Sequence, residues 1–384
     1  MQHPLSSWND TAAHVGRTRP DHPVLYFLPA RLQASALRFV AGFPGLVSYA
    51  VKANDRAEVL ANLAAAGVGA FDVASPAEMR AVRAAAPRAV LHYNNPVRSV
   101  AEVGDGVAAG VASWSVDDAG ELDKLSAVPR GHEIAVRFAI PVKGAAYDFG
   151  AKFGTTPEDA AGLLRRVAAA GWTPALCFHP GTQCEDAGAW ARYIEAAARI
   201  AGRAGVRIAR LNVGGGFAAH RHGTAPDLEH VFAVIGAAAR RAFGADAPAL
   251  VCEPGRALVA EAFTLATRIK GMRAAGATVY LNDGIYGGLA DLRDMGLTGR
   301  IRTIGPDGAA RCGPPRPRVA FGPTCDSLDR LPDGLPLPED AQPGDYVLFD
   351  GMGAYSVAMS TRFNGYGLVD VETVFRSGPF AAGH

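Results

Sequence analysis

The chain has 384 residues, of which 49% are hydrophobic and 8% aromatic, and its 38 Lys and Arg balance 37 Asp and Glu to a formal net charge of +1. These values indicate a soluble globular protein with one or two substantial cores, and they disfavour nucleic acid and anionic membrane surfaces as partners. The opening residues MQHPLSSWNDTAAH lack the pattern of a secretion signal, and no stretch approaches the roughly 18 consecutive apolar residues of a membrane helix.

The cysteines give no sign of a disulfide framework. There are five, an odd number, and no two form a C-x-x-C pair. We therefore expect reduced thiols in a cytoplasmic protein, and we predict no metal site. The five residues are Cys177, Cys184, Cys252, Cys312 and Cys325.

From Leu46 onward, short β-type runs alternate with longer Ala-rich helical patterns such as RAEVLANLAAAG and WARYIEAAARIAGRAG. Eight strands separated by helices are what a (β/α)8 barrel requires, whereas an open doubly wound sheet rarely repeats so evenly. The sequence therefore predicts an α/β fold built on a TIM barrel. The strand candidates are 46–52, 69–74, 90–93, 111–116, 133–140, 174–179, 207–213 and 249–253.

The composition and hydrophobic pattern of the sequence change after about Ala262. Clusters of Pro and Gly then separate short strand-like runs such as TVYLND, RVAFGP and YVLFDG. We expect a β-rich second domain, sandwich-like or barrel-like, over 263–384, joined by residues 1–23. The barrel domain is expected over 24–262.

Polar residues lie at the C-terminal ends of several predicted barrel strands, and TIM barrels carry their active sites at this edge. A lysine, two carboxylates, a histidine, a glycine run and an arginine would therefore meet on one face. They are Lys52, Asp72, His179, Gly214–Gly216, Glu253 and Arg256.

The lysine and the glycine run each have an ordinary interpretation, a lysine stem lying along apolar surface and a tight turn. A partly desolvated lysine at a barrel mouth is, however, also typical of a Schiff base. Glycines after a strand let backbone N–H groups close on a phosphate, and Arg256 would add a bidentate contact. Lys52 and Gly214–Gly216 together thus predict pyridoxal 5'-phosphate (PLP) as the cofactor.

Two further residues allow two interpretations each, and a third, Asp72, has an ordinary one. Glu253 could begin a surface loop, or it could face the ring nitrogen of PLP and keep it protonated. His179 could be a core histidine or could stack on the cofactor ring. Asp72 could belong to the start of the next helix, for which Ser75 has the sequence of an N-cap.

Seven motifs in order make a family resemblance specific: YAVKAN, FDVAS, FHPGTQ, VGGGF, EPGR, GPTCDSLD and GAYSVAMSTRFNGYG. Together they resemble the PLP-dependent ornithine/diaminopimelate decarboxylase family, which uses an alanine-racemase-type barrel. The similarity extends from about Val24 to about Gly367. It implies an amino-acid decarboxylase, with ornithine decarboxylase the most similar type.

The resemblance also implies roles for individual residues. Lys52 would be the Schiff-base lysine, Glu253 the partner of the pyridine nitrogen and His179 the ring-stacking residue, with Asp72 near Lys52. Cys325 would protonate the substrate carbon after CO2 leaves, reaching with Asp326 into the other subunit of a head-to-tail homodimer. The phosphate would be bound by Gly214, Gly215, Gly216, Arg256 and Tyr355.

The substrate is predicted from two aspartates, Asp326 and Asp291, which would pair with a terminal ammonium group. Asp294 is an alternative to Asp291 as the residue that binds this ammonium group. Residues 325–327 are Cys-Asp-Ser, whereas diaminopimelate decarboxylases have Cys-Glu-Ser at this place. The aspartate indicates a diamine product. We expect L-ornithine first and lysine second, because one methylene provides only about 1–3 kcal/mol of discrimination.

Other substrates and functions stay open at this stage. D-isomers are alternatives because the sequence does not distinguish the stereochemistry of the substrate. A modified basic amino acid is another, because Pro180, Thr182 and the GGLADLRDMG segment depart from the family pattern and the match of the family's mid-strand arginine to Arg137 is not fixed. A racemase is disfavoured by an acidic residue at the ring nitrogen. A cofactor-free regulatory homologue is disfavoured because Lys52, Glu253 and Cys325 are all present.

Overall fold

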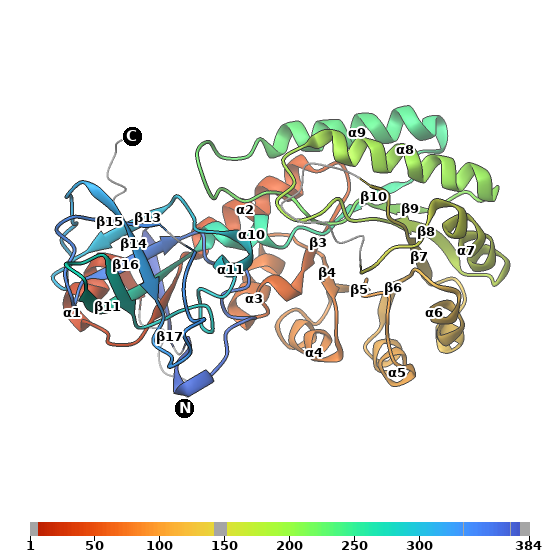
Figure 1. The fold of residues 1–384 in the computed structure, drawn as a ribbon. Coiled ribbons are helices and arrows are strands. Elements are labelled where there is room, and N and C mark those ends of the chain that lie inside the picture. The colour runs from red at the N-terminus through yellow and green to blue at the C-terminus, as the bar shows by residue number, and fades with distance from the viewer. Residues whose placement is uncertain (1–6, 142–151, 333, 369, 377–384) are drawn as a thin grey trace. The chain divides into compact units, whose positions relative to one another are not determined.

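A computed structural model describes residues 7–141, 152–332, 334–368 and 370–376 (Figure 1). Contacts divide the chain into two compact units. The barrel unit is built from residues 35–218 and 226–258, and the sheet unit from residues up to 34, residues 219–225 and residues from 259 onward. The predicted domain boundaries at 23/24 and 262/263 stay a prediction.

The barrel unit contains a closed barrel of eight strands in which every neighbouring pair is parallel. Most strand residues are buried, as expected for a sheet covered on both faces. The predicted (β/α)8 fold is thereby confirmed. The strands are β3 (Leu46–Ala50), β4 (Ala70–Val73), β5 (Val90–Tyr93), β6 (Val111–Val116), β7 (Glu133–Arg137), β8 (Thr173–Cys177), β9 (Arg210–Asn212) and β10 (Ala249–Cys252).

Helices follow the strands around the barrel (Figure 1). Their buried residues are mostly apolar, as in α3, α7, α8 and α9. Most begin at a side-chain cap that satisfies a free backbone N–H group; Ser75, for example, accepts from the backbone N–H of Glu78 as predicted. The helices are α2 (Pro29–Gly42), α3 (Ala57–Ala65), α4 (Pro76–Ala85), α5 (Val100–Ala108), α6 (Ala119–Lys124), α7 (Pro157–Ala169), α8 (Ala187–Ala204), α9 (Leu228–Phe243) and α10 (Arg256–Val259), with single 3-10 turns η1 (Val51–Ala53), η2 (Leu125–Ala127), η3 (Gly244–Asp246) and η4 (Ala260–Ala262).

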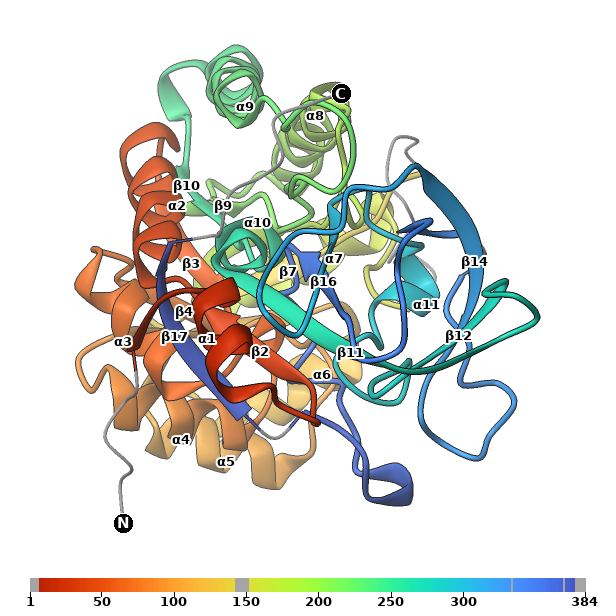
Figure 2. The ribbon, with the colours of Figure 1, turned by 90° about the vertical axis from the view of Figure 1, so that its left-hand side faces the viewer.

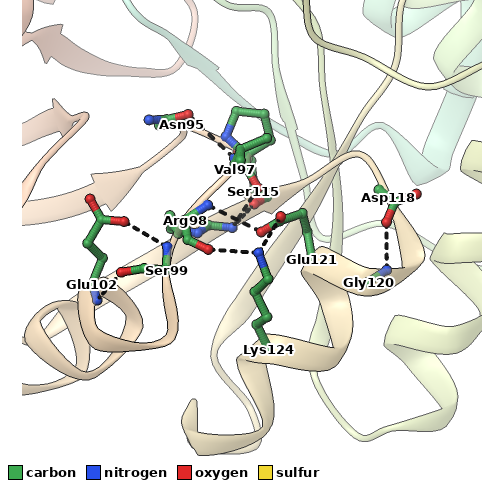
Figure 3. Close-up of polar contacts among 11 residues, drawn as sticks. Asn95, Val97, Arg98, Ser99, Glu102, Ser115, Asp118, Gly120, Glu121 and Lys124 are labelled. Carbon is green, nitrogen blue, oxygen red and sulfur yellow. Dashed lines mark hydrogen bonds and ion pairs between the residues drawn. The ribbon is translucent and has the colours of Figure 1, made fainter.

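A buried arginine joins two of the βα connections (Figure 3). Arg98 is 2% exposed and donates hydrogen bonds to the carbonyls of Tyr93, at 3.0 Å, and Ser115. Its own carbonyl accepts from Lys124 Nζ at 2.8 Å, and its N–H donates to Glu121 at 3.2 Å. Burial lowers the pKa of Arg98 to about 10, so it stays charged at neutral pH. These bonds fix the loop after β5 to the end of β6 and to α6.

The sheet unit is a nine-stranded mixed sheet, as the change of texture after Ala262 predicted. Its first and last strands, β1 and β17, pair in parallel, and α1 (Thr11–Thr18, red) packs on β2 and β17 through Val15 (Figure 2). The strands are β1 (Ser7–Asp10), β2 (Val24–Phe27), β11 (Phe263–Arg273), β12 (Thr278–Leu281), β13 (Ile301–Ile304), β14 (Pro315–Phe321), β15 (Leu335–Pro338), β16 (Tyr346–Asp350) and β17 (Asp370–Arg376), with the short helix α11 (Leu292–Met295) and the turn η5 (Phe363–Gly365).

No helix in the described ranges has the length and apolar character needed to cross a bilayer. All five cysteines are free; three are buried, whereas Cys312 and Cys325 are exposed. The cytoplasmic location inferred from them stays a prediction.

Candidate functional site

Because all eight barrel strands run in parallel, their C-terminal ends share one edge, and the predicted site residues of the barrel unit lie there. Asp72 is inside β4, and Glu253 directly follows β10. The predicted strand ends for Lys52 and His179 are corrected by two residues: β3 ends at Ala50, so that Lys52 lies on turn η1, and β8 ends at Cys177.

Lys52 is exposed between the buried residues Val51 and Ala53. Its ammonium charge acts on both nearby carboxylates. Burial raises the pKa of Asp72, the charge of Glu253 raises it further, and Lys52 opposes the shift. Burial likewise raises the pKa of Glu253, against the hydrogen bond from Asn212 and the charge of Lys52. One cation, the buried Asp72 carboxylate and the half-buried Glu253 carboxylate are therefore electrostatically connected at the mouth, an arrangement typical of active sites.

Glu253 is held by two asparagines that sequence reasoning missed. Oε1 accepts hydrogen bonds from the Nδ2 groups of both Asn94 and Asn212. Asn94 follows β5, and Asn212 is the last residue of β9. Their signal in the sequence is their place at strand ends, the criterion that selected Lys52 and Glu253. No hydrogen bond to Oε2 of Glu253 occurs among the described residues, so this oxygen is available to a ligand.

His179 is held as an uncharged imidazole. Its Nδ1 atom accepts a hydrogen bond from the backbone N–H of Gly181 at 3.1 Å, which assigns the ring proton to Nε2. Burial lowers the pKa of His179 well below its usual value, and the charges of Lys52 and Arg137 lower it further. A neutral ring of this kind can lie against an aromatic cofactor without adding charge.

The glycine run after β9 forms a cradle that only glycine can build. Gly214 and Gly216 have positive φ angles of 70° and 84°. A Cβ atom on Gly215 would lie 2.6 Å from the carbonyl oxygen of Glu253 and 3.2 Å from Nε2 of His179. The N–H groups of Gly215 and Gly216 make no hydrogen bond within the described parts of the chain, which leaves them for an anion.

PLP fits this set of residues. The site offers a lysine amine, a carboxylate with one unoccupied oxygen, a neutral imidazole and a glycine loop with two available N–H groups. Arg256 is buried at the first position of α10, four residues after β10. Within the described ranges no group of three or more His, Cys, Asp or Glu side chains is arranged to hold a metal.

The other predicted site residues belong to the sheet unit. Tyr355 is half-buried, with a positive φ of 65°. Cys325 is exposed, and its backbone N–H donates to Asn364 Oδ1 at 3.1 Å. With Asp326 it lines a cavity of about 350 Å³, whose wall includes Lys270 and Phe321.

The three candidate aspartates have different partners. Asp326 accepts a 2.6 Å hydrogen bond from the hydroxyl of Tyr286, which lowers the pKa of its carboxyl. Asp291 is 6% exposed and ion-paired with Arg221 at 3.5 Å, so its charge is already engaged inside the sheet unit. Asp294 is exposed and pairs with its neighbour Arg293.

Comparison with known proteins identifies the family to which the chain belongs. The family model described as "Pyridoxal-dependent decarboxylase, pyridoxal binding domain" matches residues 30–260. A lysine/ornithine decarboxylase from Selenomonas ruminantium is 32% identical over 329 residues, which cover 83% of this chain and 81% of the relative. The ornithine decarboxylase of Mus musculus is 30% identical over 354 residues, which cover 86% and 76%.

The chain belongs to the pyridoxal-dependent decarboxylases. It is therefore a PLP-dependent lyase. Among solved structures, a lysine decarboxylase from Selenomonas ruminantium matches with a TM-score of 0.80 and 29% identity, covering 94% of each chain. A lysine/ornithine decarboxylase from Vibrio vulnificus, complexed with cadaverine, matches with a TM-score of 0.80 and 26% identity, covering 95% of this chain and 97% of the other.

Proposed function

We propose that the protein removes the α-carboxylate of a basic amino acid, with L-ornithine as the first choice and putrescine and CO2 as the products. Lysine, giving cadaverine, is the second choice. The names of the lysine/ornithine and ornithine decarboxylases that the chain resembles support this substrate class. The observation that carries the proposal is the half-buried Glu253 carboxylate, fixed by two amides at the barrel mouth.

The barrel residues would bind and tune the cofactor. PLP, when bound, supplies a protonated ring that accepts the electron pair left behind by the departing carboxylate. Lys52 would hold the cofactor through Nζ, and Glu253 would keep the proton on the ring nitrogen. His179 would cover one face of the ring as a neutral group. The phosphate would take the N–H groups of Gly215 and Gly216, with Arg256 and Tyr355 completing its site.

Removal of CO2 leaves an electron pair that must return to the α-carbon with a proton. We assign that proton to Sγ of Cys325, a thiol exposed in its own unit. Burial raises the pKa of Asp72, and the charge of Lys52 opposes that shift. Asp72 would therefore be ionised when Lys52 is charged and protonated when Lys52 is neutral.

Asp326 is our choice for the residue that binds the distal ammonium group of the substrate. The hydrogen bond from Tyr286 lowers the pKa of Asp326, so the carboxylate stays ionised across neutral pH and attracts a cation. Asp291 is a weaker choice because Arg221 already balances its charge.

We propose a homodimer in which Cys325 and Asp326 of one subunit complete the site around Lys52 of the other. Mixing a Lys52→Ala chain with a Cys325→Ala chain tests this directly. Hybrid dimers would contain one intact site, and random exchange should restore roughly a quarter of the wild-type activity. Absence of recovery after confirmed subunit exchange would contradict a shared site.

The substrate proposal is tested by measuring CO2 release from a panel of L- and D-ornithine, L-lysine, L-arginine and meso-diaminopimelate. We expect the highest kcat/KM for L-ornithine, with L-lysine lower by about 10–200-fold, the effect of one methylene in a pocket. Activity on diaminopimelate alone would refute the role given to Asp326. Exchange of the α-proton without CO2 release would identify an isomerase instead.

A further inference from the structure

We propose that Asn94 is a positioning residue that holds Glu253 ionised and turns Oε2 of that carboxylate toward the ring nitrogen of the cofactor. The inference rests on the proposed role of Glu253. It goes beyond that role because it assigns the control of ring protonation to a residue on the opposite side of the barrel mouth.

The position of Asn94 supports this assignment. The barrel order is β10, β3, β4, β5, so two strands separate the end of β5, where Asn94 lies, from the end of β10, where Glu253 lies. The side chain therefore reaches across the mouth to donate to Oε1 of Glu253. Its own backbone N–H donates to Oδ1 of Asp72 at 3.3 Å. One residue thus contacts both carboxylates of the site.

The bonding pattern determines which oxygen of Glu253 carries the cofactor contact. Asn94 and Asn212 both donate to Oε1, and no described residue donates to Oε2. Two N–H donors on one oxygen favour the ionised carboxylate, which burial alone disfavours. They also prevent rotation of the carboxylate, because rotation would leave two buried amide groups unsatisfied.

Asn94 and Asn212 differ in what else they do. Oδ1 of Asn212 accepts from the N–H of Gly214 at 2.9 Å, so this residue also shapes the glycine cradle. Oδ1 of Asn94 is buried and has no hydrogen-bond partner among the described residues. A residue kept 7% exposed with an unsatisfied acceptor is unfavourable for stability alone, which argues for a function of its donor group.

The test uses holoenzyme loaded with PLP labelled with ¹⁵N in the pyridine ring. Asn94→Leu keeps the approximate shape of the side chain and removes the donor; Asn94→Ala is a second variant if the leucine chain folds poorly. Loss of one donor makes Glu253 more basic, so the ring proton should move to the carboxylate. We expect the ¹⁵N resonance to shift from the pyridinium toward the neutral pyridine position, with PLP bound about 10-fold more weakly.

The matched control is Asn95→Leu, because Asn95 is adjacent and, among the described residues, its side chain accepts only from the N–H of Val97. The control should retain the wild-type resonance. Asn212→Leu should shift the resonance and also weaken phosphate binding. An unchanged ¹⁵N resonance in PLP-loaded Asn94→Leu or Asn94→Ala would overturn the inference. Because no substrate is present in this measurement, a wrong choice of substrate cannot produce that result.

Discussion

Replacing Lys52 with alanine is expected to lower CO2 release from L-ornithine by at least about 10⁴-fold, the upper range for loss of a group that acts directly on the reacting atoms. The cause would be loss of the amine that holds the cofactor, at a position where Val51 and Ala53 anchor the turn in the core. The variant should keep its fold, because the lysine side chain is exposed. Steady-state kinetics with added PLP provide the measurement.

Lys124→Ala is the matched control for Lys52→Ala. Lys124 lies on α6 and bonds to Glu121 and to the carbonyl of Arg98, so its loss affects the β5–α5 connection near Arg98 and leaves the two hydrogen bonds to Glu253 in place (Figure 3). The control should keep kcat within a few-fold of wild type. Substantial decarboxylation by Lys52→Ala would remove this lysine from the mechanism.

Replacing Glu253 with glutamine is expected to lower kcat by roughly 10²–10³-fold, the usual effect of removing one preorganised electrostatic partner of the reacting group. Glutamine keeps the shape of the side chain, but it cannot hold a proton on the ring nitrogen. The electron sink is therefore weakened while the phosphate cradle stays intact. The measurement is kcat together with the absorption spectrum of the bound cofactor.

The control for Glu253→Gln is Glu229→Gln on α9. Glu229 is exposed and pairs with Arg38, and such surface pairs contribute about 0–1 kcal/mol. This variant should match wild type in both kcat and spectrum. A Glu253→Gln enzyme with the wild-type kcat would contradict the assigned role of the carboxylate.

The barrel could be predicted because the sequence patterns of its strands and helices are local. Each strand is a short buried run next to an amphipathic helix, and eight repeats specify closure. The rule that strand ends carry function then selected Lys52, Asp72 and Glu253, which the structure connects electrostatically. The two-residue error at Lys52 arose because turn η1 continues the apolar pattern of β3.

The contacts that sequence reasoning missed are non-local. Asn94 in YNNP resembles a turn residue, and its bond to Glu253 joins positions 159 residues apart. The ion pair between Arg221 and Asp291 similarly joins two distant segments, so the sequence offered Asp291 as a free carboxylate. The pairing of β1 with β17 brings the two ends of the chain into one sheet, which no local pattern predicts.

The central claim is that PLP is held at the barrel mouth by Lys52. Reduction of the holoenzyme with borohydride, followed by proteolysis and mass spectrometry, measures this directly, because reduction fixes the cofactor to the amine that carries it. We expect the reduced pyridoxyl group on the peptide that contains Lys52 and on no other lysine peptide. Modification of Lys124, Lys270 or another lysine in its place, with Lys52 unmodified, would contradict the account.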